Sequence, residues 1–245
     1  MRYAAVTTYA PKHWRGHARR MVESFGQHWD GVPLLALNDD ALAAAAPGLP
    51  AFKARYPQSR FHGRVNGTYD MRFDAVRFAH KVYAIAVAAE RCDADVLVWL
   101  DADTVTHEPV TAGWLDGLIG GADIACLLRS AKYTECGFVM YRLNDKGREF
   151  IRRFVGLYDS GALFRLAEWH DSFAFDHVRI EMQEKDGLTV ASLSGEAAHR
   201  GHPFVNCDLA SVMDHCKGSR KAAGRSRPGD LMAPRSEPYW SRGTP

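Results

Sequence analysis

The stretch Val96-Leu-Val-Trp-Leu-Asp-Ala-Asp-Thr-Val105 decides the fold of this chain. Its first five residues are all apolar, which is typical of a strand buried on both faces of a parallel sheet. Asp101 and Asp103 follow directly, and on an extended backbone two side chains at this spacing point the same way. Carboxylate oxygens suit Mg²⁺ and Mn²⁺, and open α/β sheets bind their ligands where the strands end. The stretch therefore predicts a metal site at the edge of a buried strand.

Strand and helix patterns alternate along the rest of the chain. The expected strands cover residues 3–8, 33–37, 95–100, 122–128, 138–143 and 188–193. Helical spacing of apolar residues covers residues 12–28, 73–91, 146–158 and 172–177. Asn38 is placed to cap an alanine-rich helix, whereas prolines and glycines mark residues 47–70 as a loop. The alternation predicts an α/β fold with a mostly parallel central sheet flanked by helices.

Domain organisation follows from the same patterns. Residues 1–221 are expected to form one domain, because the alternation runs through them without a linker. From residue 222 the composition shifts to glycine and proline with few aliphatic residues, so residues 222–245 are expected to be an extended C-terminal tail or lid. Within that tail, Tyr239 and Trp240 are expected to pack against the domain.

Composition excludes several classes of protein. The 245 residues are 47% hydrophobic and 24% charged, as in an ordinary soluble globular protein. Lys and Arg number 31 against 29 Asp and Glu, so the net charge of +2 does not indicate a nucleic-acid partner. No apolar run approaches the roughly 20 residues of a membrane span. Five cysteines without a CxxC pair, and no visible secretory signal, favour a cytoplasmic protein.

A second motif is the stretch Asp214-His-Cys-Lys-Gly-Ser-Arg-Lys221, which contains the pattern HxxGxxK. The imidazole of His215 is a credible additional ligand for Mn²⁺. Gly218 allows close backbone approach, and the neighbouring cations can face phosphate oxygens. Together with the two aspartates, the motif describes a metal with a diphosphate on its other side. Two upstream histidines stay open as replacements for His215 as the ligand: His199 and His202.

The two motifs together resemble those of the metal-dependent GT-A glycosyltransferases, particularly the glycogenin and lipopolysaccharide galactosyltransferase type. The resemblance implies a single GT-A (Rossmann-like) domain and a hexosyltransferase activity. It implies that Asp101, Asp103 and His215 hold Mn²⁺ or Mg²⁺, which binds the diphosphate of a nucleotide-sugar donor such as a UDP-sugar. Transfer to an acceptor hydroxyl with retention of the anomeric configuration is favoured. The acceptor (saccharide, lipid-linked or protein) and the oligomeric state stay open.

The resemblance also implies roles for residues between the motifs. Asp171, in the run Trp169-His-Asp171, stands where the family has an Asp-Gln pair near the anomeric carbon, so it is the candidate catalytic carboxylate. A helix N-cap is the alternative role for Asp171. The stretch Glu135–Tyr141 stands where the family has Asn-Ala-Gly-Val, although the Asn is missing. The implied contacts with the donor are Thr8, Tyr9, Arg77, Lys81, Ala102, Cys136, Gly137, Lys217, Gly218 and Lys221.

Other functions remain open beside this one. An inverting transferase would need a carboxylate base, which Asp171 or Glu168 could supply. A haloacid-dehalogenase-like phosphatase would use Asp101 as nucleophile and Asp103 as acid and base, but about 100 residues precede its motif here and HxxGxxK has no role in it. A third alternative is a non-catalytic module that binds sugar nucleotides.

Overall fold

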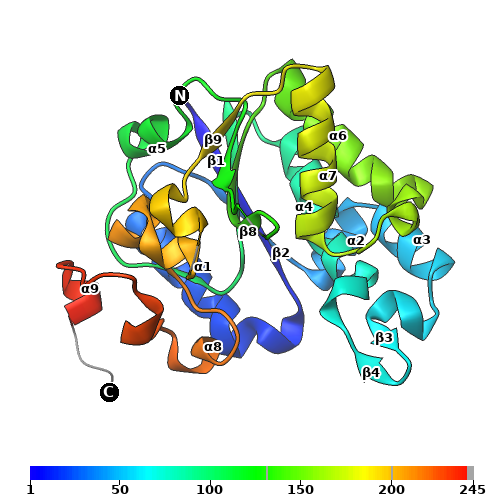
Figure 1. Ribbon diagram of the computed structural model, residues 1–245, viewed down its shortest axis with the longest axis horizontal. Coiled ribbons are helices and arrows are strands. Elements are labelled where there is room, and N and C mark those ends of the chain that lie inside the picture. Colours follow the sequence, from blue (N-terminus) through cyan, green and yellow to red (C-terminus); the bar gives the residue numbers. More distant parts are fainter. Residues whose placement is uncertain (131, 200, 242–245) are drawn as a thin grey trace.

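The computed structural model describes residues 1–130, 132–199 and 201–241, and its centre is a six-stranded sheet in the order β2-β1-β5-β8-β7-β9 (Figure 1). The strands are β1 Tyr3–Tyr9, β2 Leu34–Asn38, β5 Val96–Leu100, β7 Ile124–Leu127, β8 Glu135–Arg142 and β9 Val190–Ser192. The pairs β1/β2, β1/β5 and β7/β9 are parallel. Among these six strands β8 alone runs antiparallel to its neighbours. The predicted α/β class with a mostly parallel sheet is confirmed.

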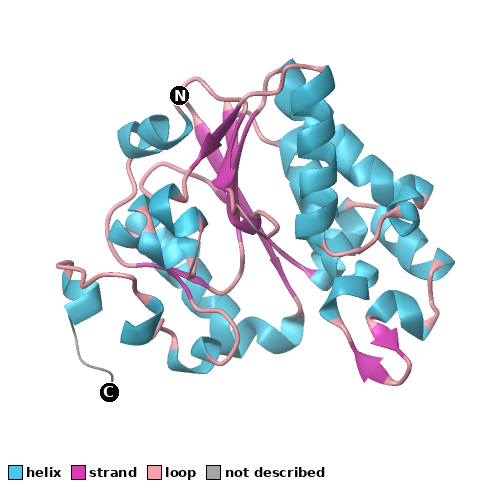
Figure 2. Cartoon of the chain, in the orientation of Figure 1, coloured by secondary structure: helices cyan, strands magenta, loops and turns pink. Residues whose placement is uncertain are grey.

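Helices cover both faces of this sheet (Figure 2). One face carries α2 Asp39–Ala45, α3 Gly48–Arg55, α4 Ala75–Arg91, α6 Asp145–Ser160 and α7 Asp171–Lys185. The other face carries α1 Arg19–His28 and α5 Ala112–Ile119. The central strand β5 explains this arrangement, because Leu97 and Trp99 pack into the first layer while Val96, Val98 and Leu100 pack into the second. The unbroken apolar run is therefore a strand that is buried on both sides.

Side-chain caps set where several helices begin. The side chain of Asn38 accepts a hydrogen bond from the backbone N–H of Ala41 at 2.8 Å, which confirms the predicted cap of α2. Asp74 accepts from the N–H of Arg77 at 3.2 Å at the start of α4. Helix α4 then runs along the sheet, which places one face of its first turns near the end of β5.

The structure differs from the sequence prediction in two segments. The predicted loop 47–70 contains α3 and a small hairpin of β3 Arg64–Val65 and β4 Thr68–Tyr69. Burial of Leu49 and Phe52 in the core stabilises α3 in spite of its proline and glycine. The predicted helix 12–28 is regular only from Arg19, since a 3-10 turn at Pro11–His13 and a π-helical turn at Trp14–Ala18 precede it.

A second, two-stranded sheet lies beside the central one. It pairs β6 Thr104–Thr106 with β10 Met213–His215 in antiparallel register, with His215 opposite Thr104. Both strands have three residues, too few for a pattern in the sequence to predict them. This pairing joins the segment after β5 to the HxxGxxK segment.

The C-terminal segment continues from β10 through α8 Arg220–Ala223 to α9 Pro238–Ser241. Trp240 is buried against Val205 and Ala210, and its indole N–H donates to the carbonyl of Ala210 at 2.7 Å. The expected packing of Trp240 is thus observed, while residues 242–245 of the predicted tail lie outside the described residues. In the part of the chain that is described, no helix combines the length and the apolar character that crossing a bilayer requires.

Candidate metal centre

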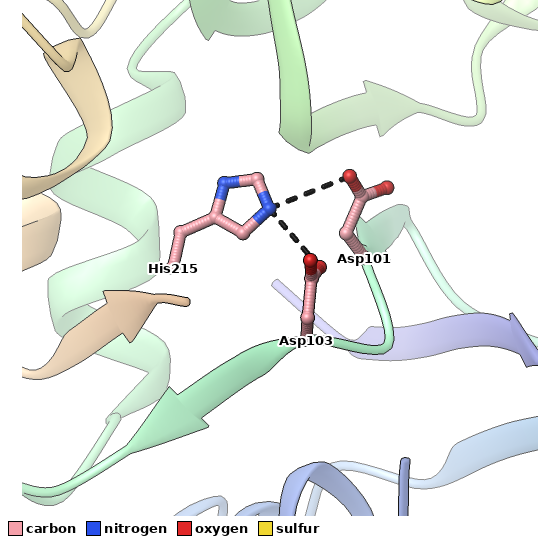
Figure 3. A group of neighbouring side chains, drawn as sticks. All are labelled: Asp101, Asp103 and His215. Carbon is pink, nitrogen blue, oxygen red and sulfur yellow. Dashed lines mark hydrogen bonds and ion pairs between the residues drawn. The ribbon is translucent and has the colours of Figure 1, made fainter. Parts of the chain in front are cut away.

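The two aspartates of the first motif lie where β5 ends. The backbone N–H of Asp101 donates to the carbonyl of Gly137 on the neighbouring strand β8 at 2.9 Å. The chain then turns, and the N–H of Thr104 donates to the carbonyl of Asp101 at 3.0 Å. Asp101 and Asp103 consequently direct their carboxylates to the same side of the turn (Figure 3). This is the carboxyl edge of the sheet, where α/β folds bind ligands.

His215 completes the cluster from 112 residues further along the chain. The β6/β10 pairing sets it beside the turn, and its side chain is fully buried. Nε2 of His215 lies 3.1 Å from Oδ1 of Asp103 and 3.5 Å from Oδ2 of Asp101 (Figure 3). Both carboxylates thus face the same imidazole nitrogen.

This donor set fits a divalent cation. One ligand atom from each of Asp101, Asp103 and His215 lies within 4.8 Å of the others. Adjacent ligands of an octahedral ion with bonds of roughly 2.1 Å are about 3 Å apart. Nε2 of His215 lies at 3.1 and 3.5 Å from the two carboxylates, which is close to that separation. Two carboxylates and an imidazole are a combination that Mn²⁺ accepts. The residues present therefore fit the metal that the Asp-x-Asp and histidine motifs imply.

The two alternative histidines make other contacts. Nδ1 of His199 lies 2.9 Å from Oγ of Ser130, and Nε2 of His202 lies 3.3 Å from the carbonyl oxygen of His215. Within the residues that the structure describes, the three-residue cluster includes His215 and neither of these two.

Two lysines neutralise the carboxylates of the cluster. Nζ of Lys81 lies 2.9 Å from Oδ1 of Asp101, and Nζ of Lys221 lies 2.9 Å from Oδ2 of Asp103. Burial disfavours the charged form of Asp101, but the charges of Lys81 and His215 outweigh it and hold the pKa of that carboxyl well below its usual range. A bound cation would therefore meet carboxylates that are already ionised.

The carboxylates of Asp101 and Asp103 raise the pKa of the His215 imidazole. Burial opposes the charged form of His215, but the neighbouring Asp103 and Asp101 prevail and raise its pKa to about 9. Without a metal the imidazole is thus protonated at neutral pH. Because only the neutral ring can be a ligand, metal binding must release this proton.

Asp171 lies at the first position of α7, and the structure corrects its alternative role. The N-cap is His170, whose Nδ1 accepts from the N–H of Phe173 at 3.4 Å. The cap prediction for Asp171 is therefore wrong, because the helix begins one residue earlier than that role requires. Instead Oδ2 of Asp171 accepts from Nζ of Lys81 at 2.6 Å. One ammonium thus joins the candidate catalytic carboxylate to Asp101, a candidate metal ligand.

Cys136 and Gly137 shape the site through packing. A Cβ atom on Gly137 would lie 2.4 Å from Cε1 and 2.6 Å from Nδ1 of His215, so only glycine leaves room for this ring. The Cys136 side chain is buried in the core, while its carbonyl accepts from Nζ of Lys81 at 2.9 Å. These contacts are with the protein itself, and a contact of either residue with a donor stays a prediction.

The other residues implied to contact a donor make their described contacts with neighbouring parts of the protein. Thr8 and Tyr9 end β1, next to β5 in the sheet, and the Thr8 hydroxyl donates to the carbonyl of Leu37 at 2.8 Å. The Tyr9 ring lies 5.3 Å from that of Trp14, and Arg77 donates to the hydroxyl of Tyr69 at 3.0 Å. Ala102 is half-buried between the two aspartates, and Gly218 has a φ of 58°, a backbone conformation that favours glycine. Their roles toward a donor also stay predictions.

Glu168, the alternative base, makes its contacts away from the two aspartates. It accepts from the hydroxyl of Tyr133 at 2.8 Å, and its other oxygen lies 3.0 Å from Nε2 of His170. Tyr133 lies in the loop before β8, and His170 is the N-cap of α7. Of the two carboxylates considered as a base, Asp171 is the one tied through Lys81 to the metal cluster.

Two residues of the site were not predicted from the sequence. The indole N–H of Trp99 donates to Oδ1 of Asp101 at 2.8 Å and so helps to orient that carboxylate. Glu135 is buried, forms an ion pair with Lys217, and lines with it a pocket of about 370 Å³. Little in the sequence indicated Glu135, because the predicted strand 138–143 does not include it, whereas the observed strand β8 begins at Glu135 and buries it.

Comparison with known proteins finds similarity only among solved structures. The sequence matches no protein-family model and no curated protein. The fold is similar to the glycosyltransferase GlyE of Streptococcus pneumoniae TIGR4, with 16% identity and a TM-score of 0.46 for its apo form and 17% and 0.47 for a second crystal structure. Each match covers 80% of this chain and 46% of GlyE, so this chain spans about half the length of that protein.

A further similar structure is the apo form of mouse xyloside xylosyltransferase 1. The identity is 10% and the TM-score 0.46, with 79% of this chain and 86% of that chain covered. All three structures are of proteins whose names denote glycosyltransferases. At TM-scores of 0.46 and 0.47 they carry no argument for this chain, so its function is inferred from the side chains of the site.

Proposed function

We propose that this chain is a glycosyltransferase that moves a sugar from a nucleotide-diphosphate donor, a UDP-sugar, to an acceptor hydroxyl with the help of Mn²⁺ or Mg²⁺. The observation that carries the proposal is the convergence of Asp101, Asp103 and Nε2 of His215 at the carboxyl edge of β5. The motifs that supply these side chains resemble those of GT-A transferases. The assignment as a glycosyltransferase is supported by the candidate metal site at the carboxyl edge of β5 and not by the fold alone.

The chemistry of the leaving group explains why such a site is needed. A nucleoside diphosphate gains negative charge as the glycosidic bond breaks, and a bound divalent cation supplies Lewis-acid stabilisation for it. Lys221 contacts Asp103 at 2.9 Å and its side chain is one-third exposed, so it can reach from the carboxylate to a phosphate oxygen. Lys217 has a side chain that is 42% exposed and can do the same from its position beside Glu135. Both lysines belong to the HxxGxxK segment.

Asp171 is proposed to act on the donor sugar. Its Oδ2 is engaged by the ammonium of Lys81, which suits hydrogen bonding and charge stabilisation better than removal of a proton from an acceptor. Such a carboxylate can bind sugar hydroxyls or stabilise the positive charge that develops at the anomeric carbon. This role is compatible with the retention of configuration that the motif resemblance favours. The tail or lid predicted at residues 222–245 is proposed to close the diphosphate side of the site.

A donor-hydrolysis screen tests the proposal. The purified protein is incubated with UDP-, GDP-, CMP- and dTDP-sugars in the presence of Mn²⁺ or of EDTA. We expect Mn²⁺-dependent hydrolysis of a UDP-sugar that is lost in Asp103→Asn and kept in Asp93→Asn, a matched exposed aspartate that pairs with Arg2. Binding of the donor without turnover would instead favour a non-catalytic module. Turnover of p-nitrophenyl phosphate, without any of a sugar nucleotide, would favour the phosphatase.

A further inference from the structure

The second ring nitrogen of His215 is an unsatisfied polar atom. Nε2 faces the two aspartates, whereas Nδ1 is buried and has no hydrogen-bond partner among the described residues. The nearest carboxylate on that side is Glu135, whose Oε1 lies 3.7 Å from Nδ1. Glu135 comes from the start of β8, on the opposite side of the ring from the metal cluster. The imidazole of His215 therefore lies between Asp101 and Asp103 on its Nε2 side and Glu135 on its Nδ1 side.

Metal binding sets a requirement on this buried nitrogen. When Nε2 is a ligand, the ring is neutral and its proton resides on Nδ1. A buried N–H without an acceptor destabilises the protein, and metal-bound histidines usually donate this N–H to a carboxylate or carbonyl. The 3.7 Å separation is longer than a hydrogen bond, so a small shift of either side chain would be needed to form one.

We propose that Glu135 is a positioning residue, which accepts the Nδ1–H of His215 and so presents Nε2 to the cation held with Asp101 and Asp103. The inference rests on the metal site of the proposed function and not on the transfer of a sugar.

Three features of the structure hold Glu135 in place for this role. Its Oε1 accepts from the N–H of Gly137 at 3.2 Å, and its Oε2 is paired with the ammonium of Lys217. Gly137 also provides the space for the imidazole, since a Cβ there would lie 2.6 Å from Nδ1 and 3.1 Å from Oε1 of Glu135. The start of β8 thus forms a seat that fits both the ring and the carboxylate.

The contact with Lys217 links Glu135 to the HxxGxxK segment. Lys217 lies two residues after His215, in the same HxxGxxK segment. It supplies the positive charge that a buried carboxylate requires, because its ammonium is bonded to Glu135. The segment therefore brings in both the metal ligand and the counter-ion of the residue that orients this ligand.

Two substitutions separate this role from mere packing. Glu135→Met keeps the approximate volume but offers only a weakly accepting thioether sulfur, whereas Glu135→Gln keeps an oxygen that can accept from Nδ1–H. We expect Glu135→Met to weaken Mn²⁺ binding 10–100-fold, measured by electron paramagnetic resonance with the metal alone, and Glu135→Gln to stay within a few-fold of the unaltered protein. Asp176→Asn is the matched control, because this carboxylate holds the preceding Thr134 at 2.5 and 2.8 Å.

The position of the proton gives a second readout that packing alone would not change. In ¹⁵N-histidine-labelled protein with Mg²⁺, which is diamagnetic, the ¹⁵N shifts of His215 should show the proton on Nδ1. In Glu135→Met this tautomer should no longer be uniquely populated. Unchanged Mn²⁺ affinity in Glu135→Met would overturn the proposal. So would an unprotonated Nδ1 in the metal-loaded, unaltered protein, even if no variant folds. Neither measurement uses a sugar nucleotide, so failure of the proposed function would show separately.

Discussion

Lys81 and Asp171 form a buried ion pair in which Nζ lies 2.6 Å from Oδ2, and this pair joins α4 to the start of α7. The same ammonium contacts Asp101 at 2.9 Å. Burial disfavours the charged ammonium, but the two carboxylates prevail and raise the pKa of Lys81 well above its usual value. Lys81 is therefore a fixed positive charge between a candidate metal ligand, Asp101, and the candidate catalytic carboxylate, Asp171.

Asp171→Asn should reduce sugar transfer with little loss of stability. In the proposed role Asp171 lies beside the anomeric carbon, and removal of a catalytic group typically lowers turnover about 10²- to 10⁴-fold. Lys81 would keep its contacts with Asp101 and with the carbonyl of Cys136, so the melting temperature should change little. Turnover and melting are measured together, with the exposed Glu181→Gln on the same helix as control. Near-normal transfer in Asp171→Asn would remove Asp171 from the mechanism.

Lys81→Met should destabilise the metal-free protein and make it depend on metal. Removing one partner of a buried ion pair leaves the other charge uncompensated, at a cost of roughly 3–5 kcal/mol. Here two carboxylates, Asp101 and Asp171, would lose their shared partner. A bound cation replaces part of the lost charge, so Mn²⁺ should raise the melting temperature of this variant more than that of the unaltered protein. Lys185→Met, at an exposed pair, is the control, and equal metal-induced shifts in all three proteins would contradict the idea.

Metal affinity should rise with pH. Since the pKa of His215 in the metal-free fold is about 9, binding below that pH releases close to one proton, and affinity should increase up to about tenfold per pH unit. The stability of the metal-free fold should change in the opposite direction and fall as the pH rises. The raised pKa means that protonated His215 stabilises the metal-free fold fully below about pH 6.5, and that this contribution is lost as the pH rises through about 9. Calorimetry of Mn²⁺ binding between pH 6.5 and 8.5, in buffers of different ionisation heats, gives the number of protons released for each Mn²⁺ bound. An affinity independent of pH would contradict the assignment.

Gly137→Ala should damage the site through its geometry. The added methyl would lie 2.4 Å from Cε1 and 2.6 Å from Nδ1 of His215, so the ring must leave the position in which Nε2 faces the aspartates. Overpacking of this kind costs about 1–3 kcal/mol, and the displaced nitrogen should bind Mn²⁺ more weakly. Gly113→Ala in α5 is the control, because a Cβ there meets nothing within 4 Å. If both variants melt and bind Mn²⁺ like the unaltered protein, the close packing of Gly137 on His215 is refuted.

The parts of the fold that the sequence predicts are those set by neighbouring residues. The apolar run of β5 and the aspartates after it specify a buried strand and a polar turn within ten residues. The cap at Asn38 acts over three residues and was likewise predictable. In each case the physical cause, burial on two faces or one hydrogen bond to a nearby backbone N–H, is contained in the local sequence.

The rest of the site depends on contacts between distant segments. His215 reaches Asp103 because two three-residue strands pair, and no periodicity can be read from three residues. Glu135 is part of the site because a glycine two residues later leaves space for a ring from another segment. The N-cap assigned to Asp171 was wrong by one residue, since Asp and His can both accept from the first helical N–H groups and only tertiary contacts decide between them.

The last prediction concerns the segment that links the metal site to the C-terminus. Asp214, next to His215, is fully buried and accepts from both the N–H and the hydroxyl of Ser226 at 2.6 Å and from the hydroxyl of Tyr239 at 2.9 Å. These bonds fix both ends of residues 217–225, whereas the basic side chains between them are partly exposed. We expect UDP with Mn²⁺ to slow amide exchange across residues 217–225, because charge-assisted bonds to the diphosphate offset the entropy of ordering the loop.

The controls for this exchange measurement come from the same chain. Residues 64–69 form the β3/β4 hairpin, whose amides should exchange equally with and without ligand. Tyr239→Phe removes one bond to Asp214, worth about 1 kcal/mol, and should speed exchange near Ser226 while leaving Mn²⁺ affinity unchanged. Equal exchange of residues 217–225 in the presence and absence of UDP and Mn²⁺ would show that the HxxGxxK segment does not close over a diphosphate, and would direct the search for phosphate contacts to Arg77 and to the end of β1.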